Sequence, residues 1–303
     1  MDSARMQPLA QLPDAALRRV QGLLTDIDDT LTRDGAIEAP ALQALHDLAA
    51  AGLPVIAVTG RPAGWSEAFA MAWPVVAIVA ENGAVMLRRD GGHLRQDFVQ
   101  DAATRAAHLE RLRRCAAELR TAVPQARLAR DSAGRLTDIA VDHSEFARLD
   151  EAAIARVVAL MHAEGMNATV SSIHVNGWFG THDKWSGARW AVQQTQGRPL
   201  DAASWLYVGD SANDQRMFEQ LPLSVAVANI ARFVPQLQVL PAYVTPSERG
   251  RGFAERTGDY FWAQSSWKSS SPLAVAWSTS GSPWMASPPA GRTPGSGDRT
   301  VDL

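Results

Sequence analysis

The sequence predicts an α/β fold, in which a parallel β-sheet with crossover helices is interrupted by an inserted α+β module. Short apolar runs alternate with helical patterns at the start of the chain, hairpins and two long helices follow, and the alternation then resumes. Alternation of strand and helix is typical of parallel sheets, because parallel strands need a crossover connection. The chain has 303 residues, enough for one large domain or two modest ones.

The first segment of the expected core, residues 20–86, alternates three strands with two helices. The strands are short apolar runs, and the helices show apolar residues at helical spacing. Gly52 follows the first helical pattern and is a typical helix stop. The expected strands are 22–27, 53–60 and 75–83, and the expected helices are 39–52 and 62–72.

The inserted module, residues 87–180, is expected to form a cap of hairpins and helices. Gly91 and Gly92 separate two strand-like runs and predict a tight hairpin turn, and Gly165 ends a long helical pattern. The expected hairpins are 84–99 and 126–142, the expected helices are 102–120 and 146–165, and one or two strands are expected within 168–180.

The core is expected to resume over residues 181–262 with helices and strands in alternation. From residue 263 to 303, Ser, Pro and Gly dominate without periodicity, which predicts a disordered tail. The tail contains Trp267, Trp277 and Trp284, so docking on the core or on a partner is the alternative. The expected helices are 184–197, 212–221 and 252–262, and the expected strands are 204–210, 223–229 and 242–245.

The composition limits the kinds of partner and cellular compartment that are expected. The apolar fraction of 46% and charged fraction of 20% are ordinary for a globular protein, and the net charge of −3 gives no support for a nucleic-acid or anionic-membrane partner. The single cysteine, Cys115, excludes a disulfide within the chain and suits a reducing compartment. Because neither a signal peptide nor a membrane span is recognisable, we expect a soluble cytoplasmic protein.

Polar and charged side chains follow several expected strands at their carboxyl ends, where ligands bind in parallel α/β sheets. Clustered carboxylates become tolerable when a hard dication lies among them, and Mg²⁺ prefers oxygen ligands. An ionised carboxylate can attack phosphorus, while a lysine and a hydroxyl can hold phosphoryl oxygens. The side chains expected at this edge are Asp26, Asp28, Thr59, Lys184, Asp210, Asn213 and Asp214.

Each of these residues alone has a purely structural explanation. Aspartates are common in turns and at helix caps, Thr59 could cap a helix, and an isolated lysine is usually a solvated surface residue. Their joint order, with each at a predicted strand end or helix start, favours the functional interpretation.

At these residues the chain resembles the haloacid dehalogenase-like phosphatases and phosphotransferases. The stretches "ENGAV" and "AYVTPSERGRGFAE" of this chain also resemble the members that carry a large cap after the third strand. This resemblance implies a Rossmann-like core with a type II, subclass B cap. That group includes sucrose-phosphate, trehalose-phosphate and mannosyl-phosphoglycerate phosphatases. The four motifs are "DIDDTLT" (26–32), Thr59 in "AVTGRP", Lys184 in "DKWSGA", and "VGDSANDQRMF" (208–218).

The resemblance implies a role for each matching residue. Asp26 is the expected nucleophile, and Asp28 the expected general acid and then general base. Thr59 and Lys184 are expected to bind the transferring phosphoryl group, with Asn213 as a hydrogen-bonding partner.

The resemblance also implies a Mg²⁺ site. Asp26, the backbone carbonyl of Asp28, and Asp210 are the expected ligands. Asp214 is expected as a further ligand or as a residue that orients the others. Thr30 is expected to support the loop, and Asp29 to shape its turn.

Substrate specificity is expected to come from the cap. His174, Asn176 and Trp178 alternate along an expected strand, so they share a face that could bind a sugar. The structural alternative is that Trp178 lies in the core and His174 is exposed to solvent. Arg61 could contact a substrate anion or stabilise its loop.

The leading hypothesis is a phosphomonoesterase for a small phosphorylated metabolite such as a sugar phosphate. A sugar phosphomutase or phosphotransferase, and a catalytically idle binding or scaffold protein, are the alternatives.

Overall fold

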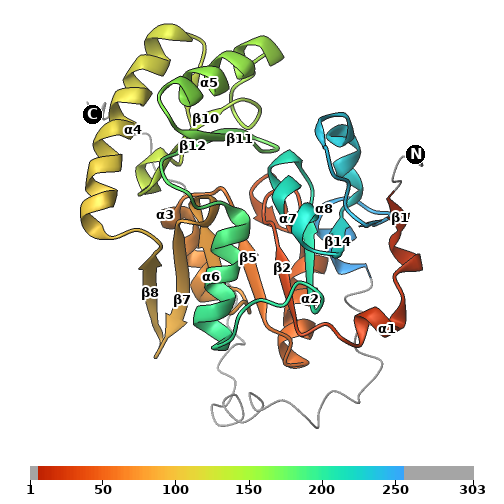
Figure 1. The fold of residues 1–303 in the computed structure, drawn as a ribbon. Coiled ribbons are helices and arrows are strands. Elements are labelled where there is room, and N and C mark those ends of the chain that lie inside the picture. Colours follow the sequence, from red (N-terminus) through yellow and green to blue (C-terminus); the bar gives the residue numbers. More distant parts are fainter. Residues whose placement is uncertain (1–5, 256–303) are drawn as a thin grey trace. The chain divides into compact units, whose positions relative to one another are not determined.

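A nine-stranded β-sheet forms the centre of the computed structural model, which describes residues 6–255 (Figure 1). Seven neighbouring strands of this sheet are parallel, and the last two at one edge are antiparallel. The predicted α/β fold with a parallel-dominated sheet is confirmed. In spatial order the strands are β1 (Gln7–Pro8), β15 (Tyr243–Val244), β14 (Leu223–Ala226), β13 (Trp205–Gly209), β2 (Gly22–Thr25), β5 (Val55–Val58), β6 (Ala77–Ala80), β7 (Val85–Asp90) and β8 (His93–Phe98).

Helices cover this sheet through their apolar sides. Side chains of α6 (Lys184–Gln196) and α7 (Gln215–Gln220) share one buried cluster with Leu24 of β2 and Val79 of β6. Figure 1 shows α6 in front of the sheet. Burial of apolar side chains is the main favourable term in such packing. The other helices of this part are α1 (Asp14–Leu17), α2 (Ala39–Ala50), α3 (Ala63–Ala72) and α8 (Arg249–Ala254).

A separate four-stranded antiparallel sheet, with two long helices, forms the inserted module. Its apolar face, which includes Val141 and Val175, packs in one buried cluster with residues of both helices. Because side chains alternate along a strand, the polar residues between them lie on the opposite face. The elements are α4 (Ala102–Ala122), α5 (Glu151–Ala163), and in spatial order β11 (Asn167–Val170), β12 (His174–Trp178), β10 (Asp138–Asp142) and β9 (Arg127–Leu128).

The hairpin of β7 and β8 belongs to the main sheet and not to the cap, where the sequence pattern placed it. We expected the cap to begin at residue 87, but β7 pairs with β6 and β8 pairs with β7, so both extend the main sheet. The reason is that Val85, Met86 and Leu87 are fully buried and continue the apolar surface of β6. The chain therefore leaves this sheet only after Phe98, and the wider division into core and cap stays a prediction.

Smaller elements were not predicted from the sequence. They include the short hairpin of β3 (Thr32–Arg33) and β4 (Ala36–Ile37), directly after the acidic run, and the edge strand β1. The predicted helix 252–262 extends beyond the described residues, and the expected tail lies wholly outside them. Within residues 6–255, none of the helices combines the length and hydrophobicity that crossing a bilayer requires.

Candidate active site

Adjacent parallel strands bring the first two aspartates of the site together. Asp26 directly follows β2 and Asp210 directly follows β13, and these strands are hydrogen-bonded neighbours. The backbone N–H of Asp26 donates to the carbonyl of Val208 (2.9 Å), which holds the two strand ends in register. Thr59 follows β5 on the other side of β2. Asp26, Asp210 and Thr59 therefore lie at one edge of the sheet, and their chemical roles stay predictions.

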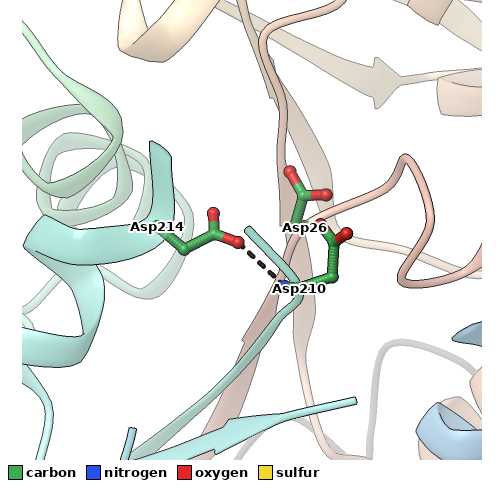
Figure 2. Close-up of side chains that lie close together, drawn as sticks. All are labelled: Asp26, Asp210 and Asp214. Carbon is green, nitrogen blue, oxygen red and sulfur yellow. Dashed lines mark hydrogen bonds between the residues drawn. The ribbon is translucent and has the colours of Figure 1, made fainter. Parts of the chain in front are cut away.

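Three carboxylates form a compact acidic cluster at this edge. Asp26, Asp210 and Asp214 each place a carboxylate oxygen within 4.8 Å of the others, and Figure 2 shows their arrangement. All three side chains are buried. Burial raises the pKa of Asp26 to about 8, Lys184 opposes this shift, and the neighbouring carboxylates add to it. Burial, then Asp26 and Asp214, also raise the pKa of Asp210 well above its ordinary value.

The cluster fits a divalent metal ion. The Oδ1 atom of Asp210 is buried and has no hydrogen-bond partner among the described residues, although buried carboxylate oxygens normally have one. A hard dication would supply that partner and offset the mutual repulsion of the carboxylates. The same cation would lower the pKa values of Asp26 and Asp210. Asp26 and Asp210 therefore remain the best candidates for metal ligands.

Lys184 balances the charge of the cluster from the first residue of α6. Asp183 caps this helix, where its side chain accepts from the N–H of Ser186, so the start of the helix is fixed. The Nζ atom of Lys184 donates to Oδ1 of Asp26 (2.6 Å) and to Oδ1 of Asp214 (2.7 Å). Burial alone lowers the pKa of Lys184, but Asp214 and Asp26 raise it above its ordinary value, so the side chain stays protonated.

Each carboxylate oxygen of Asp214 already accepts two hydrogen bonds. Its Oδ2 accepts from the backbone N–H groups of Asp210 (2.9 Å, Figure 2) and Ser211 (3.1 Å). Its Oδ1 accepts from the Tyr207 hydroxyl (2.6 Å) as well as from Lys184. Of the two predicted roles for Asp214, this geometry favours orientation of the Asp210 loop over direct metal ligation.

Asn213 and Thr59 lie at the same edge and hold neighbouring groups. Oδ1 of Asn213 accepts from Lys184 Nζ (3.2 Å) and from the Ser211 hydroxyl (2.8 Å). Oγ1 of the fully buried Thr59 accepts from the backbone N–H of Arg61 (3.0 Å). The Thr59 hydroxyl still has a proton to donate, as phosphate binding would require.

Arg61 connects Asp28 with the inserted module. Its Nε donates to both carboxylate oxygens of Asp28 (2.9 and 3.1 Å), and its Nη atoms donate to Glu145 (2.8 Å) and Asp131 (3.2 Å). The guanidinium is only 5% exposed, so these contacts are shielded from water. Hydrogen bonds from His174 and Arg61 hold the pKa of Glu145 at about 2 although burial opposes them. Arg61 thus holds the acid–base candidate Asp28 against the inserted module, and its contact with a substrate anion stays a prediction.

The three cap residues share a face, as predicted, but they divide between two cavities. His174 and Asn176 line a cavity of about 10 Å³ beside Asp26 and Asp28, whereas Trp178 lines one of about 330 Å³ beside Lys184. His174 contacts Glu145 (Nε2 to Oε2, 3.0 Å), Asn176 donates to the carbonyl of Gly60 (3.1 Å), and Trp178 donates to the carbonyl of His182 (2.8 Å). All three are buried, so the solvated position considered for His174 is wrong.

Glu81 is a buried residue of this region that the sequence reasoning did not single out. Its carboxylate accepts from the backbone N–H groups of Ala63 (2.9 Å), Leu136 (3.0 Å) and Thr137 (2.6 Å), which connects β6 to the segment before β10. Burial is the largest cause that raises its pKa, to about 7. The only signal was its place in "ENGAV", near the end of the predicted strand 75–83.

Asp29 lies in a second network that was not predicted. Its carboxylate accepts from Arg249 (2.7 Å) and Arg232 (2.8 Å), and its backbone carbonyl accepts from Asn229 (3.0 Å). Asp29 adopts a left-handed backbone (φ 56°), consistent with the expected turn. Nothing in the local pattern around 229–249 indicates these contacts, because they join segments about 200 residues apart.

Comparison with known proteins supports the resemblance. Residues 23–112 match the family model of haloacid dehalogenase-like hydrolases. No curated protein matches the sequence significantly.

Solved structures share the fold over most of their length. A protein from Thermoplasma acidophilum matches with a TM-score of 0.60 and 19% identity, over 78% of this chain and 96% of its own. The sucrose-phosphatase from Synechocystis, in complex with sucrose and phosphate, matches with a TM-score of 0.56 and 18% identity, over 78% and 96%. The C-terminal domain of Candida albicans trehalose-6-phosphate phosphatase matches with a TM-score of 0.58 and 15% identity, over 84% and 98%. The predicted resemblance to haloacid dehalogenase-like hydrolases is confirmed.

Proposed function

We propose that the protein is a Mg²⁺-dependent phosphomonoesterase that hydrolyses a small phosphorylated metabolite through an aspartyl-phosphate, with sugar phosphates as the favoured substrate class. The arrangement of the acidic cluster carries this proposal. Asp26 and Asp210 follow adjacent parallel strands, and Lys184 donates a hydrogen bond to Asp26. Asp210 keeps a buried carboxylate oxygen without a partner among the described residues. The cytoplasmic location and the absence of nucleic-acid and membrane partners stay predictions.

The residues divide the chemistry in two steps. The carboxylate of Asp26 attacks phosphorus while the bond to the leaving oxygen breaks, and Asp28 protonates that oxygen. Asp28 then takes a proton from the water that attacks the aspartyl-phosphate, which releases inorganic phosphate and restores Asp26. Lys184 and Thr59 hold the phosphoryl oxygens. Asp26, the Asp28 carbonyl and Asp210 would hold a Mg²⁺ ion, which would supply further positive charge.

Two observations support a sugar phosphate. The structurally similar sucrose-phosphatase and trehalose-6-phosphate phosphatase act on sugar phosphates by name. The cavity beside Lys184 is lined by Trp178, Asn82, Asn167 and Thr169, which offer an aromatic ring, amides and a hydroxyl. Such groups bind uncharged hydroxyl-rich molecules by hydrogen bonding and stacking.

A phosphate-release screen tests the proposal. Purified protein is incubated with a panel of sugar phosphates and other phosphomonoesters, with Mg²⁺ or with EDTA. We expect release of inorganic phosphate only with Mg²⁺, and its loss in Asp26→Asn. Asp34→Asn is the matched control, because Asp34 is exposed and asparagine tolerates its left-handed backbone (φ 52°). Unchanged turnover in Asp26→Asn would exclude the mechanism.

A phosphomutase is the second candidate, and one observation favours it. The cavity beside Asp26 and Asp28 has a volume of only about 10 Å³, and Arg61, which lines it, joins this edge to Glu145 of the inserted module. A closed site excludes water and favours transfer to a second hydroxyl. Formation of an isomeric sugar phosphate without phosphate release would identify this activity. Neither product would be expected from a catalytically idle binding or scaffold protein.

A further inference from the structure

Asn229 lies between the two loops that carry the acidic cluster. It belongs to the helical turn Ala228–Arg232 that follows β14, and it is 8% exposed. Its Nδ2 donates to Oδ2 of Asp210 (3.0 Å) and to the backbone carbonyl of Asp29 (3.0 Å). Its Oδ1 accepts from the backbone N–H of Arg249 (3.0 Å). Both amide protons and the amide oxygen are therefore used.

The chemistry of these partners fixes the orientation of the amide. An amide side chain can in principle be turned over, which exchanges its oxygen and nitrogen. Here the backbone N–H of Arg249 can only donate and the Asp29 carbonyl can only accept, and the Asp210 carboxylate, when ionised, accepts as well. A turned amide would place oxygen against two acceptors and nitrogen against a donor, so only the observed orientation is compatible.

This orientation decides which oxygen of Asp210 is available. Asn229 engages Oδ2, and Oδ1 is left buried without a partner among the described residues. Arg232 approaches the same Oδ2 atom at 3.5 Å, but its side chain is 45% exposed and already donates to Asp29 at 2.8 Å. The amide of Asn229 is thus the shorter and better shielded contact to the Asp210 carboxylate.

The second amide proton holds the other loop. The Asp29 carbonyl is part of the turn that follows Asp26 and Asp28, so one amide group spans the ends of β2 and β13. Groups that hydrogen-bond metal-ligating carboxylates orient them, and their loss typically costs about 10- to 100-fold in metal affinity.

We propose that Asn229 is a positioning residue of the metal site, which presents Oδ1 of Asp210 to the ion and fixes its distance from Asp26. This inference rests on the proposed function, since it requires that the acidic cluster binds Mg²⁺. It assigns Asn229 no contact with substrate.

Metal binding without substrate tests this role. Mg²⁺ affinity is measured by isothermal titration calorimetry, and Mn²⁺ affinity by electron paramagnetic resonance, for the wild type, Asn229→Ala and Asn229→Ser. Gln43→Ala is the control, because Gln43 makes a similar amide-to-carboxylate hydrogen bond (2.9 Å to Asp47) on the exposed side of α2. We expect Kd for both metals to rise by about 10- to 100-fold in the Asn229 variants and to stay unchanged in the control.

A purely structural role would give a different result. Circular dichroism and urea unfolding in EDTA report the folded fraction, and metal affinity is compared only among variants that are fully folded in buffer. If Asn229→Ala does not fold, Asn229→Ser or Asn229→Gln provides the comparison. A folded Asn229 variant with wild-type metal affinity would overturn the inference while phosphate release by the wild type still supported the proposed function. A wild-type protein that binds neither metal would overturn both.

Discussion

Replacement of Lys184 by methionine is the perturbation whose effect the structure defines best. The Nζ atom lies 2.6 Å from Asp26 and 2.7 Å from Asp214, and the side chain is 3% exposed. Removal of one partner from such a buried ion pair costs about 3–5 kcal/mol, because the remaining charge has no counter-charge. Methionine keeps the length and apolar stem of lysine, so the change isolates the charge.

The neighbouring carboxylates set the scale of this loss. Oxygens of Asp26, Asp210 and Asp214 lie within 4.8 Å of one another. Two unit charges at that distance repel by about 3.5 kcal/mol at an effective dielectric constant of about 20. Lys184 also lowers the pKa of Asp26, so the variant will hold a proton on Asp26 to a higher pH. Because the pKa of Asp26 is about 8 even with Lys184 present, this carboxyl group is largely protonated at pH 7 without a metal ion, so the repulsion is partly relieved in both proteins and the expected loss stays at about 3–5 kcal/mol.

Urea unfolding at pH 7 measures this effect. In EDTA, the free energy of unfolding of Lys184→Met should fall by about 3–5 kcal/mol. Saturating Mg²⁺ should restore part of it, because a dication replaces the missing charge. Arg113→Met is the control: its guanidinium is 61% exposed and lies 3.9 Å from Glu110, so it should change stability by less than about 1 kcal/mol. A loss below about 1 kcal/mol for Lys184→Met in EDTA would refute the reasoning.

Three further outcomes follow from buried groups elsewhere. Burial lowers the pKa of His182 from 6.5 to about 4, so the unfolded chain binds its proton first. The contribution of His182 to the free energy of unfolding should be fully present above pH 6.5 and fall by up to about 3 kcal/mol towards pH 4. Urea unfolding of His182→Asn should show a weaker fall over the same pH range. Burial raises the pKa of Cys115 to about 11, so its thiol should react with a disulfide reagent at pH 8 only after unfolding. Glu81→Gln should expose the N–H groups of Leu136 and Thr137, seen as faster hydrogen exchange there but not in β13.

Local pattern was sufficient to predict the strand ends and most of the site. Asp26 and Asp210 could be placed together because each directly follows an apolar strand, and parallel strands end at one edge. The hairpin of β7 and β8 could not be assigned to a sheet, since its apolar residues fit either the core or the cap. The choice depends on pairing with β6, which is a tertiary contact.

Contacts between distant segments could not be predicted in this way. Arg249 pairs with Asp29 across 220 residues, and Glu145 pairs with Arg61 across 84. No periodicity connects such residues, and arginine and glutamate are common on any surface. Alternation along β12 did predict a shared face for His174, Asn176 and Trp178, because period 2 is local. That His174 and Asn176 line one cavity and Trp178 another was not predictable, because Asn176 faces Gly60, which is 116 residues away in the sequence.

The register between β2 and β13 has a consequence for how such a protein can change over generations. Backbone hydrogen bonds, which any sequence can make, hold Asp26 and Asp210 at neighbouring strand ends. The lining of the larger cavity includes residues of β11, β12 and the end of α5 in the inserted module. Under the proposed function, substitutions there would alter which substrate is admitted and leave the paired strands untouched. Selection would then change the preferred substrate in small steps while the proposed reaction is inherited unaltered.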